Sequence, residues 1–162
     1  TQRRGFGVMA LNKPLFMKKI SWLALLLLVL GVGVQTVEAK SGKEDGIQFT
    51  EAKWADILKK AKAEKKIIFL DAYASWCGPC KMLQKNVFTK ADVGEYFNKQ
   101  FINVKMDMEK GEGPALAETY PLEAYPTLLF IDGNGRVKKK VIGYQSPAAL
   151  LSIGKSVAGR GI

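Results

Sequence analysis

The feature that most constrains the fold is an apolar run that leads directly into a pair of cysteines. Ile67 to Tyr73 is almost wholly apolar, with the single acid Asp71, as expected of a central strand that is covered on both faces. The sequence then reads Trp76-Cys77-Gly78-Pro79-Cys80, and a proline at this point is typical of the first turn of a helix. The sequence therefore predicts a strand, a turn and a helix with both cysteines at the start of that helix.

The spacing of Cys77 and Cys80 favours redox chemistry. Side chains three residues apart share one face of a helix, so the two thiols can close a small disulfide ring. At the helix N-terminus, unpaired N–H groups and the macrodipole stabilise a thiolate on Cys77, whereas Cys80 should be more buried and less acidic. We expect Cys77 to attack a substrate disulfide and Cys80 to resolve the mixed disulfide.

The composition argues against the other uses of a cysteine pair. The 162-residue chain has no His and no third Cys, so it offers too few ligands for a zinc site. A haem attachment site would need His at the position of Lys81. A purely structural disulfide would close too short a loop to stabilise the fold by much. We expect no metal and no cofactor.

The rest of the sequence alternates helical and strand patterns. Helices are expected at 51–64 with Thr50 as N-cap, from 78 to a break near Thr89, at 92–99 after a Thr89 cap, at 114–120 and at 147–157. Strands are expected at 67–73, 101–107, 127–131 and 136–142, with 47–49 as a short strand or an extended lead-in. The turn Asp132-Gly133-Asn134-Gly135 predicts a hairpin, so the last pair is antiparallel and the earlier pairing parallel. The predicted fold class is α/β, a mixed sheet of four to five strands with helices on both faces.

The first part of the sequence resembles an export signal. Lys18 and Lys19 precede an apolar run from Ile20 to Val34, which is short for a membrane span and typical of a signal peptide. Val37-Glu38-Ala39 is a suitable cleavage site. The expected divisions are an upstream extension (1–16), a signal peptide (17–39), a flexible lead-in (40–46), one domain (47–158) and a tail (159–162).

The alternative is that residues 17–39 stay attached as a membrane anchor. Removal of residues 1–39 would take away five basic side chains and one acidic one, and would lower the net charge from +10 to +6. The lysines at 138–140 have no interleaved aromatic residues on which bases could stack. We therefore expect no nucleic-acid partner and, after cleavage, no stable membrane insertion.

Around the cysteines the sequence resembles the active-site segment of the thioredoxin family. Residues 69–81 carry the resemblance, together with Tyr125-Pro126-Thr127, which is similar to the cis-proline loop that faces the cysteines in that family. The similarity extends over most of Phe49 to Val157 and implies a thioredoxin-like fold. The implied activity is thiol-disulfide exchange with disulfide-containing client proteins.

The resemblance also implies roles for individual residues. Asp71 matches a buried acid that assists proton transfer with Cys80, with a solvent-paired strand-end Asp as the alternative, and Lys105 matches a lysine that approaches this acid. Tyr125, the residue before the proline, would offer backbone hydrogen bonds to an extended substrate. The other expected substrate-binding residues are Trp76, Gly78, Pro79, Pro126 and Gly143. The alternatives are a surface-packed Trp76 and a Gly143 that only ends a strand.

The dipeptide between the cysteines implies a direction of exchange. Gly78-Pro79 resembles reducing members of the family, whereas a His there would stabilise the thiolate and raise the reduction potential. The proline that usually kinks the active-site helix is missing, which is more similar to exported members and to the C-terminal domain of transmembrane disulfide reductases. We expect an exported monomeric reductase, periplasmic in a Gram-negative source, that a membrane electron donor recharges. The alternatives are a binding or chaperone module without turnover and a disulfide oxidase or isomerase.

Overall fold

The computed structural model describes residues 45–159. The expected upstream extension, the signal peptide with its cleavage site, most of the lead-in and the end of the tail lie outside these residues. Within the described part, no helix is both long and apolar enough to cross a membrane.

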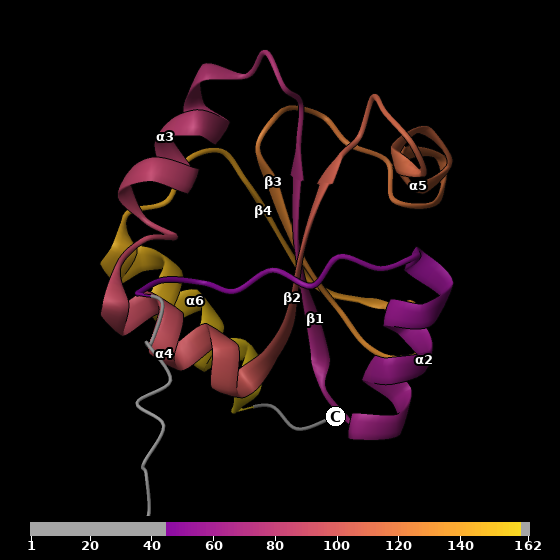
Figure 1. Cartoon of the computed structure of the whole chain (residues 1–162), viewed down its shortest axis with the longest axis horizontal. Coiled ribbons are helices and arrows are strands. Elements are labelled where there is room, and N and C mark those ends of the chain that lie inside the picture. Colours follow the sequence, from indigo (N-terminus) through magenta and orange to yellow (C-terminus); the bar gives the residue numbers. More distant parts are fainter. Residues whose placement is uncertain (1–44, 160–162) are drawn as a thin grey trace, which may run out of the picture. The chain divides into compact units, whose positions relative to one another are not determined.

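A mixed sheet of four strands organises the described residues, as the sequence predicted (Figure 1). The strand order is β2-β1-β3-β4; β1 pairs in parallel with β2 and antiparallel with β3, and β3 pairs antiparallel with β4. The strands are β1 (Ile67–Tyr73), β2 (Phe101–Asp107), β3 (Thr127–Ile131) and β4 (Val137–Ile142). The helices are α2 (Trp54–Glu64), α3 (Gly78–Asn86), α4 (Ala91–Gln100), α5 (Gly113–Thr119) and α6 (Pro147–Ala158).

Helices cover both faces of the sheet because successive strand residues point to opposite sides. On one face, α2 and α5 bury Ile57, Ala61 and Leu116 against Ile68 and Leu70 of the central strand. These apolar contacts hold α2 and α5 together on one side of the sheet, to the right in Figure 1.

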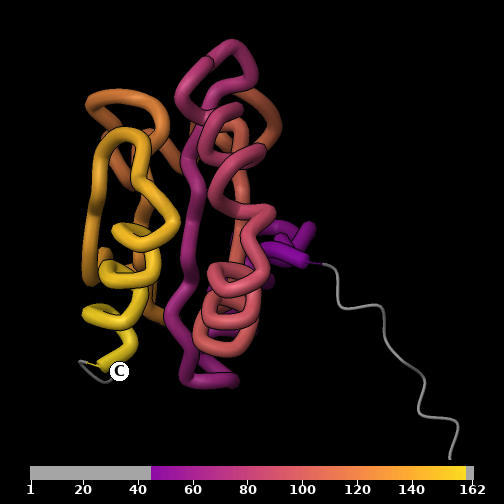
Figure 2. Tube along the Cα trace, turned by 90° about the vertical axis from the view of Figure 1, so that its left-hand side faces the viewer, coloured from indigo at the N-terminus to yellow at the C-terminus, as the bar shows by residue number. Residues whose placement is uncertain are grey.

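The second helical layer consists of α3, α4 and α6. Leu83, Phe97 and Leu150 from these helices pack against Phe69 and Phe130 of the sheet. Figure 2 looks onto this layer and shows α6 beside the pair formed by α3 and α4. The odd-numbered residues of β1 point into this layer, so Asp71 faces the same side as Phe69.

The predicted Thr50 cap is wrong. The backbone N–H of Thr50 donates to the Asn103 carbonyl at 2.8 Å, which keeps the lead-in extended, and helix α2 begins only at Trp54. The N-cap residue Lys53 makes no side-chain capping bond, and the N–H of Trp54 instead donates to Glu112 Oε2 at 3.0 Å. A side chain 58 residues away thus caps this helix, which the local sequence could not show.

The predicted Thr89 cap is also wrong. The helix does break near this residue, but the Thr89 hydroxyl donates back to the Lys85 carbonyl at 2.7 Å, at the end of α3. Helix α4 then starts at Ala91 with Lys90 as an N-cap that forms no side-chain bond. Thr89 therefore closes the preceding helix rather than opening the next one.

The other boundaries differ by a residue or two. Helix α5 begins at Gly113, one residue before Pro114. A side chain at position 113 would collide with the backbone of Asp107 and Met108. Strand β4 begins at Val137 because the N–H groups of Arg136 and its turn neighbours bind the Asp132 side chain.

Glu112→Ala should destabilise the fold by about 1 kcal/mol, because it removes the only side-chain acceptor that the described residues supply to the start of α2. Urea unfolding followed by circular dichroism measures the change. Glu118→Ala, an exposed position on α5, is the matched control. Equal losses in the two variants would contradict the capping role.

Candidate active site

The end of β1 places the two cysteines at the start of α3 (Figure 1). Cys77 is the N-cap of this helix, and its Sγ accepts a hydrogen bond from the N–H of Cys80 at 3.1 Å. The two cysteines form a disulfide with a Cα–Cα distance of 5.3 Å. Cys77 therefore lies where the unpaired N–H groups of a helix stabilise negative charge on sulfur.

Both cysteines are nearly covered in this oxidised form. The exposed fraction is 2% for Cys77 and 0% for Cys80, so the expected difference in burial is small. Gly78 and Pro79, which separate them, are exposed. The surface beside the covered disulfide is therefore formed by these two small residues.

The proline loop meets the cysteines although it lies far from them in the sequence. Tyr125 packs against the buried cluster of Ala74, Cys77 and Cys80, and its peptide bond to Pro126 is cis. The loop before β3 therefore forms one side of the site.

Gly143 lies behind this loop, directly after β4. Its N–H donates to the Pro126 carbonyl at 2.8 Å. Its φ of +89° is unfavourable for other residues, and nothing lies within 4 Å of the position that a Cβ would occupy. Backbone conformation at the end of the strand, rather than close packing, is what requires glycine here.

Trp76 is the most exposed large apolar side chain of the described residues, at 66%. Its ring stands edge-on to Tyr125, with 5.9 Å between the ring centroids. Its indole N–H donates to Glu109 Oε2 at 2.9 Å, and the neighbouring Ser75 accepts from Lys110 at 3.1 Å. Trp76 is thus both exposed and held in one orientation over the loop.

Sequence reasoning missed Glu109. It lies two residues beyond the end of β2, and β2 runs parallel to β1. The carboxyl ends of parallel strands meet at one edge of a sheet, so this pairing could have placed Glu109 near Trp76.

Asp71 is fully buried on β1, six residues before Cys77. Neither carboxylate oxygen has a hydrogen-bond partner of standard geometry among the described residues. Burial raises the pKa of Asp71 from 3.8 to about 7, and the side chain of Gln84 and the charge of Lys105 oppose this increase. The solvent-paired alternative for this acid is excluded by its burial.

Lys105 lies beside Asp71 because the two residues are partners in the parallel pairing of β1 and β2. Gln84 was missed from the sequence, although it lies four residues after Cys80 and so on the same face of α3. The structure thus surrounds the buried acid with one cation and one amide.

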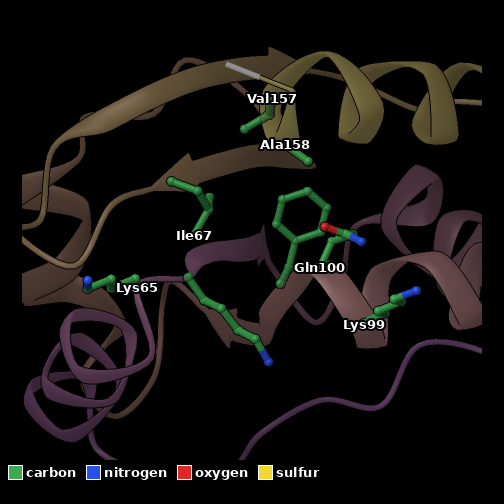
Figure 3. Close-up of a pocket in the computed structure, with 8 residues that line it drawn as sticks. Lys65, Ile67, Lys99, Gln100, Val157 and Ala158 are labelled. Atoms are coloured by element: carbon green, nitrogen blue, oxygen red, sulfur yellow. The ribbon is translucent and has the colours of Figure 1, made fainter. Parts of the chain in front are cut away.

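A separate cavity of about 180 Å³ lies at the opposite end of β1, beside Ile67 (Figure 3). Its lysines, Lys65, Lys66 and Lys99, lie at the C-terminal ends of α2 and α4. Cations there balance the partial negative charge of helix C-termini, so these lysines do not require a ligand. This cavity is not part of the candidate active site.

A disulfide that opens and closes at a helix N-terminus is the working group of a thiol-disulfide oxidoreductase, and fold and site together assign the protein to this class. The protein-family model of the thioredoxin-like domain matches residues 54–158 of the sequence. The chain therefore belongs to this family.

Three relatives place the chain within the family. It is 30% identical over 110 residues to the thiol:disulfide interchange protein DsbD of Colwellia psychrerythraea, covering 65% of this chain but only 18% of that protein. It is 29% identical over 120 residues to thioredoxin H-type 2 of Nicotiana tabacum, covering 74% of this chain and 95% of that protein. A solved structure from Bacteroides thetaiotaomicron, described as a candidate disulphide isomerase, is 46% identical with a TM-score of 0.61, covering 70% of this chain and 94% of that one.

Asp71→Asn should make the stability of the oxidised protein less dependent on pH. The unfolded chain releases this proton near pH 3.8 and the folded chain near pH 7. The free energy of unfolding of the wild type should therefore fall as the pH rises from 3.8 to 7, and it should stay constant above pH 7. Asn has the same shape without the charge, and the variant should be the more stable protein above pH 7 by a few kcal/mol, on the order of the pKa difference.

Urea unfolding at a series of pH values measures this effect. Glu118→Gln makes the same change of charge at an exposed position and should keep the wild-type pH profile. Parallel profiles for Asp71→Asn and the wild type would contradict the raised pKa.

Proposed function

We propose that the protein is an exported thiol-disulfide oxidoreductase that reduces disulfides in other exported proteins. The observation that carries the proposal is the Cys77–Cys80 disulfide at the N-terminus of α3, with Gly78-Pro79 between the sulfurs. With no His between the cysteines, the thiolate lacks the stabilisation that makes strongly oxidising members good acceptors of electrons.

The reaction starts from the dithiol form. The Cys77 thiolate attacks one sulfur of a client disulfide, forms a mixed disulfide and releases the first client thiolate. The Cys80 thiolate then attacks Cys77 Sγ, which releases the second client sulfur and leaves the disulfide seen in the structure. Two electrons pass to the client, and the two client thiolates take up protons.

Asp71 is the proposed proton acceptor for Cys80. Its raised pKa, about 7, lets the carboxyl both bind and release a proton near neutral pH. Because Lys105 opposes this increase, the lysine is proposed to keep the acid from holding its proton too tightly. The covered position of Cys80 supports an acceptor inside the protein rather than bulk water.

The client is proposed to bind across the exposed face around Trp76 and Tyr125. The two rings stand edge-on beside the disulfide, and the backbone at Tyr125-Pro126 offers hydrogen bonds to an extended segment. Gly78, Pro79 and Gly143 complete this proposed client-binding face without side chains that would block an approaching chain.

Export and recharging by a membrane donor are part of the proposal. The lysines and apolar run of residues 18–34 support export into an oxidising compartment. A reductase there needs electrons from a membrane donor, and likeness to part of a thiol:disulfide interchange protein supports exchange with another protein dithiol. The protein is proposed to act as a monomer.

Disulfide isomerisation is the second candidate, because the relative with 46% identity is described as a candidate isomerase. A third reading is a binding or chaperone module that uses the same aromatic face without turnover. Client binding that survives replacement of both cysteines, without any catalysis, would favour that third reading.

The wild-type protein should catalyse the reduction of insulin by dithiothreitol, measured as the onset of turbidity. Cys77→Ser should abolish catalysis because the attacking sulfur is lost, and Cys80→Ser should accumulate a mixed disulfide because the resolving sulfur is lost. Lys59→Ala, at an exposed position of α2, is the control for folding and handling. An inactive wild type would refute the proposed function.

The reduction potential of the cysteine pair decides the direction of exchange. Equilibration with glutathione should give a value near that of thioredoxin, about −270 mV, rather than the value of a strong oxidant, about −120 mV. Introduction of a histidine by Pro79→His should raise the potential, since an added positive charge stabilises the Cys77 thiolate. A wild-type value at the oxidising end would refute a reductase.

A further inference from the structure

The lead-in to α2, residues 45–53, contributes an aromatic ring to the surroundings of the buried acid. Its backbone is held at both ends, because the N–H of Ile47 donates to the Phe88 carbonyl and the N–H of Thr50 donates to the Asn103 carbonyl at 2.8 Å. Between these bonds, the ring of Phe49 stands edge-on to Phe88, with 5.3 Å between the centroids. The position of Phe49 is therefore set by contacts with both β2 and the segment after α3.

The Phe49 ring lies against Lys105. The Lys105 Nζ is 5.7 Å from the centre of the ring, within the range of a cation–π interaction. No described carboxylate lies within 4 Å of this ammonium, and the side chain is exposed. The ring of Phe49 is thus the contact that this ammonium makes besides its electrostatic interaction with Asp71.

A cavity of about 180 Å³ lies between the lead-in and two side chains that interact with Asp71. Its lining includes Phe49 and Asp45 from the lead-in together with Gln84 and Lys105. Gln84 and Lys105 are the two side chains that lower the proton affinity of Asp71. The lead-in, Gln84 and Lys105 therefore line the same cavity.

We propose that Phe49 is a positioning residue whose ring holds the Lys105 ammonium near Asp71, so that the lead-in adjusts the proton affinity of the buried acid. This inference rests on the proposed role of Asp71 in proton exchange with Cys80. Without the ring, Lys105 is free to extend into solvent, where water screens its charge. Asp71 would then hold its proton to a higher pH.

Few other charged or titratable groups near Asp71 come from the described elements packed against it. Besides Lys105 on β2, the titratable group is Tyr73 on β1, whose pKa is raised mainly by burial and in part by the Asp71 charge. Asp45 on the lead-in lines the cavity that Gln84 and Lys105 also line. Strand β3 places the apolar Leu128 opposite Asp71, and Gln84 on α3 is uncharged. In the disulfide form the two cysteines do not titrate. Lys105 is thus the cation that a change at Phe49 would displace.

The test is a titration of Asp71 by carboxyl ¹³C NMR in the oxidised full chain, with the resonance identified by its loss in Asp71→Asn. Phe49→Leu keeps an apolar side chain against Phe88 and removes the ring face. It should raise the Asp71 midpoint by about half a pH unit, on the order of the effect of one partly exposed charge. Phe49→Tyr keeps the ring and should keep the wild-type midpoint.

The sign of the shift separates positioning from simple burial. If Phe49 only shielded the acid from water, its loss would lower the midpoint, because hydration favours the carboxylate. In a Lys105→Met background, which itself raises the midpoint, Phe49→Leu should add nothing. An equal additional shift in that background would overturn the inference, as would an unchanged or lowered midpoint in Phe49→Leu.

Two further variants keep the test decisive. Tyr96→Leu removes a similar contact from α4, with Lys155 at 5.9 Å. It should leave the midpoint unchanged, because neither residue is among the groups that shift the pKa of Asp71. Phe49→Met replaces Phe49→Leu if the leucine variant unfolds. The titration needs no turnover, so an inactive protein that shows the coupled shift would refute the proposed function and keep this inference.

Discussion

The double coverage of strand β1 is the constraint on which the rest of the structure depends. Because β1 pairs on both edges and is packed by helices on both faces, every side chain from Ile67 to Ala72 is buried, including Asp71. The same strand leads into the turn that carries Cys77 to the start of α3, so the desolvated acid lies six residues before the disulfide in the chain. The raised pKa of that acid is thus a consequence of sheet position.

Segments far from the cysteines in sequence tune the surroundings of the site. The stretch after β2 binds the indole of Trp76 through Glu109 and caps α2 through Glu112. The lead-in restrains Lys105 through Phe49. Both segments use side chains that project from short irregular backbone, while the cysteines and the acid lie on or directly beside regular elements. Irregular segments thus add contacts around the site to those that Gln84 and Lys105 make from α3 and β2.

Much of the fold was predictable from local patterns. The apolar run of β1, the hairpin turn after β3 and the proline at the start of α3 each have a short-range physical cause, and each was found where expected. The predicted cap at Thr50 was wrong because its backbone N–H binds β2 at Asn103, which keeps this segment out of the helix. The predicted cap at Thr89 was wrong because its hydroxyl binds the Lys85 carbonyl in the preceding helix instead of an N–H in the next one.

Redox chemistry was predictable from the residues alone, because two cysteines three apart at the start of a helix share one face, and the sequence has no His to complete a metal site. The surroundings of the cysteines depend instead on contacts between distant parts of the chain. Tyr125 meets the cysteines, and Gln84 and Lys105 flank Asp71, through strand pairing and packing across the sheet. Proton affinity depends on burial and on charges within a few ångströms, and neither is encoded in residues that are neighbours along the chain.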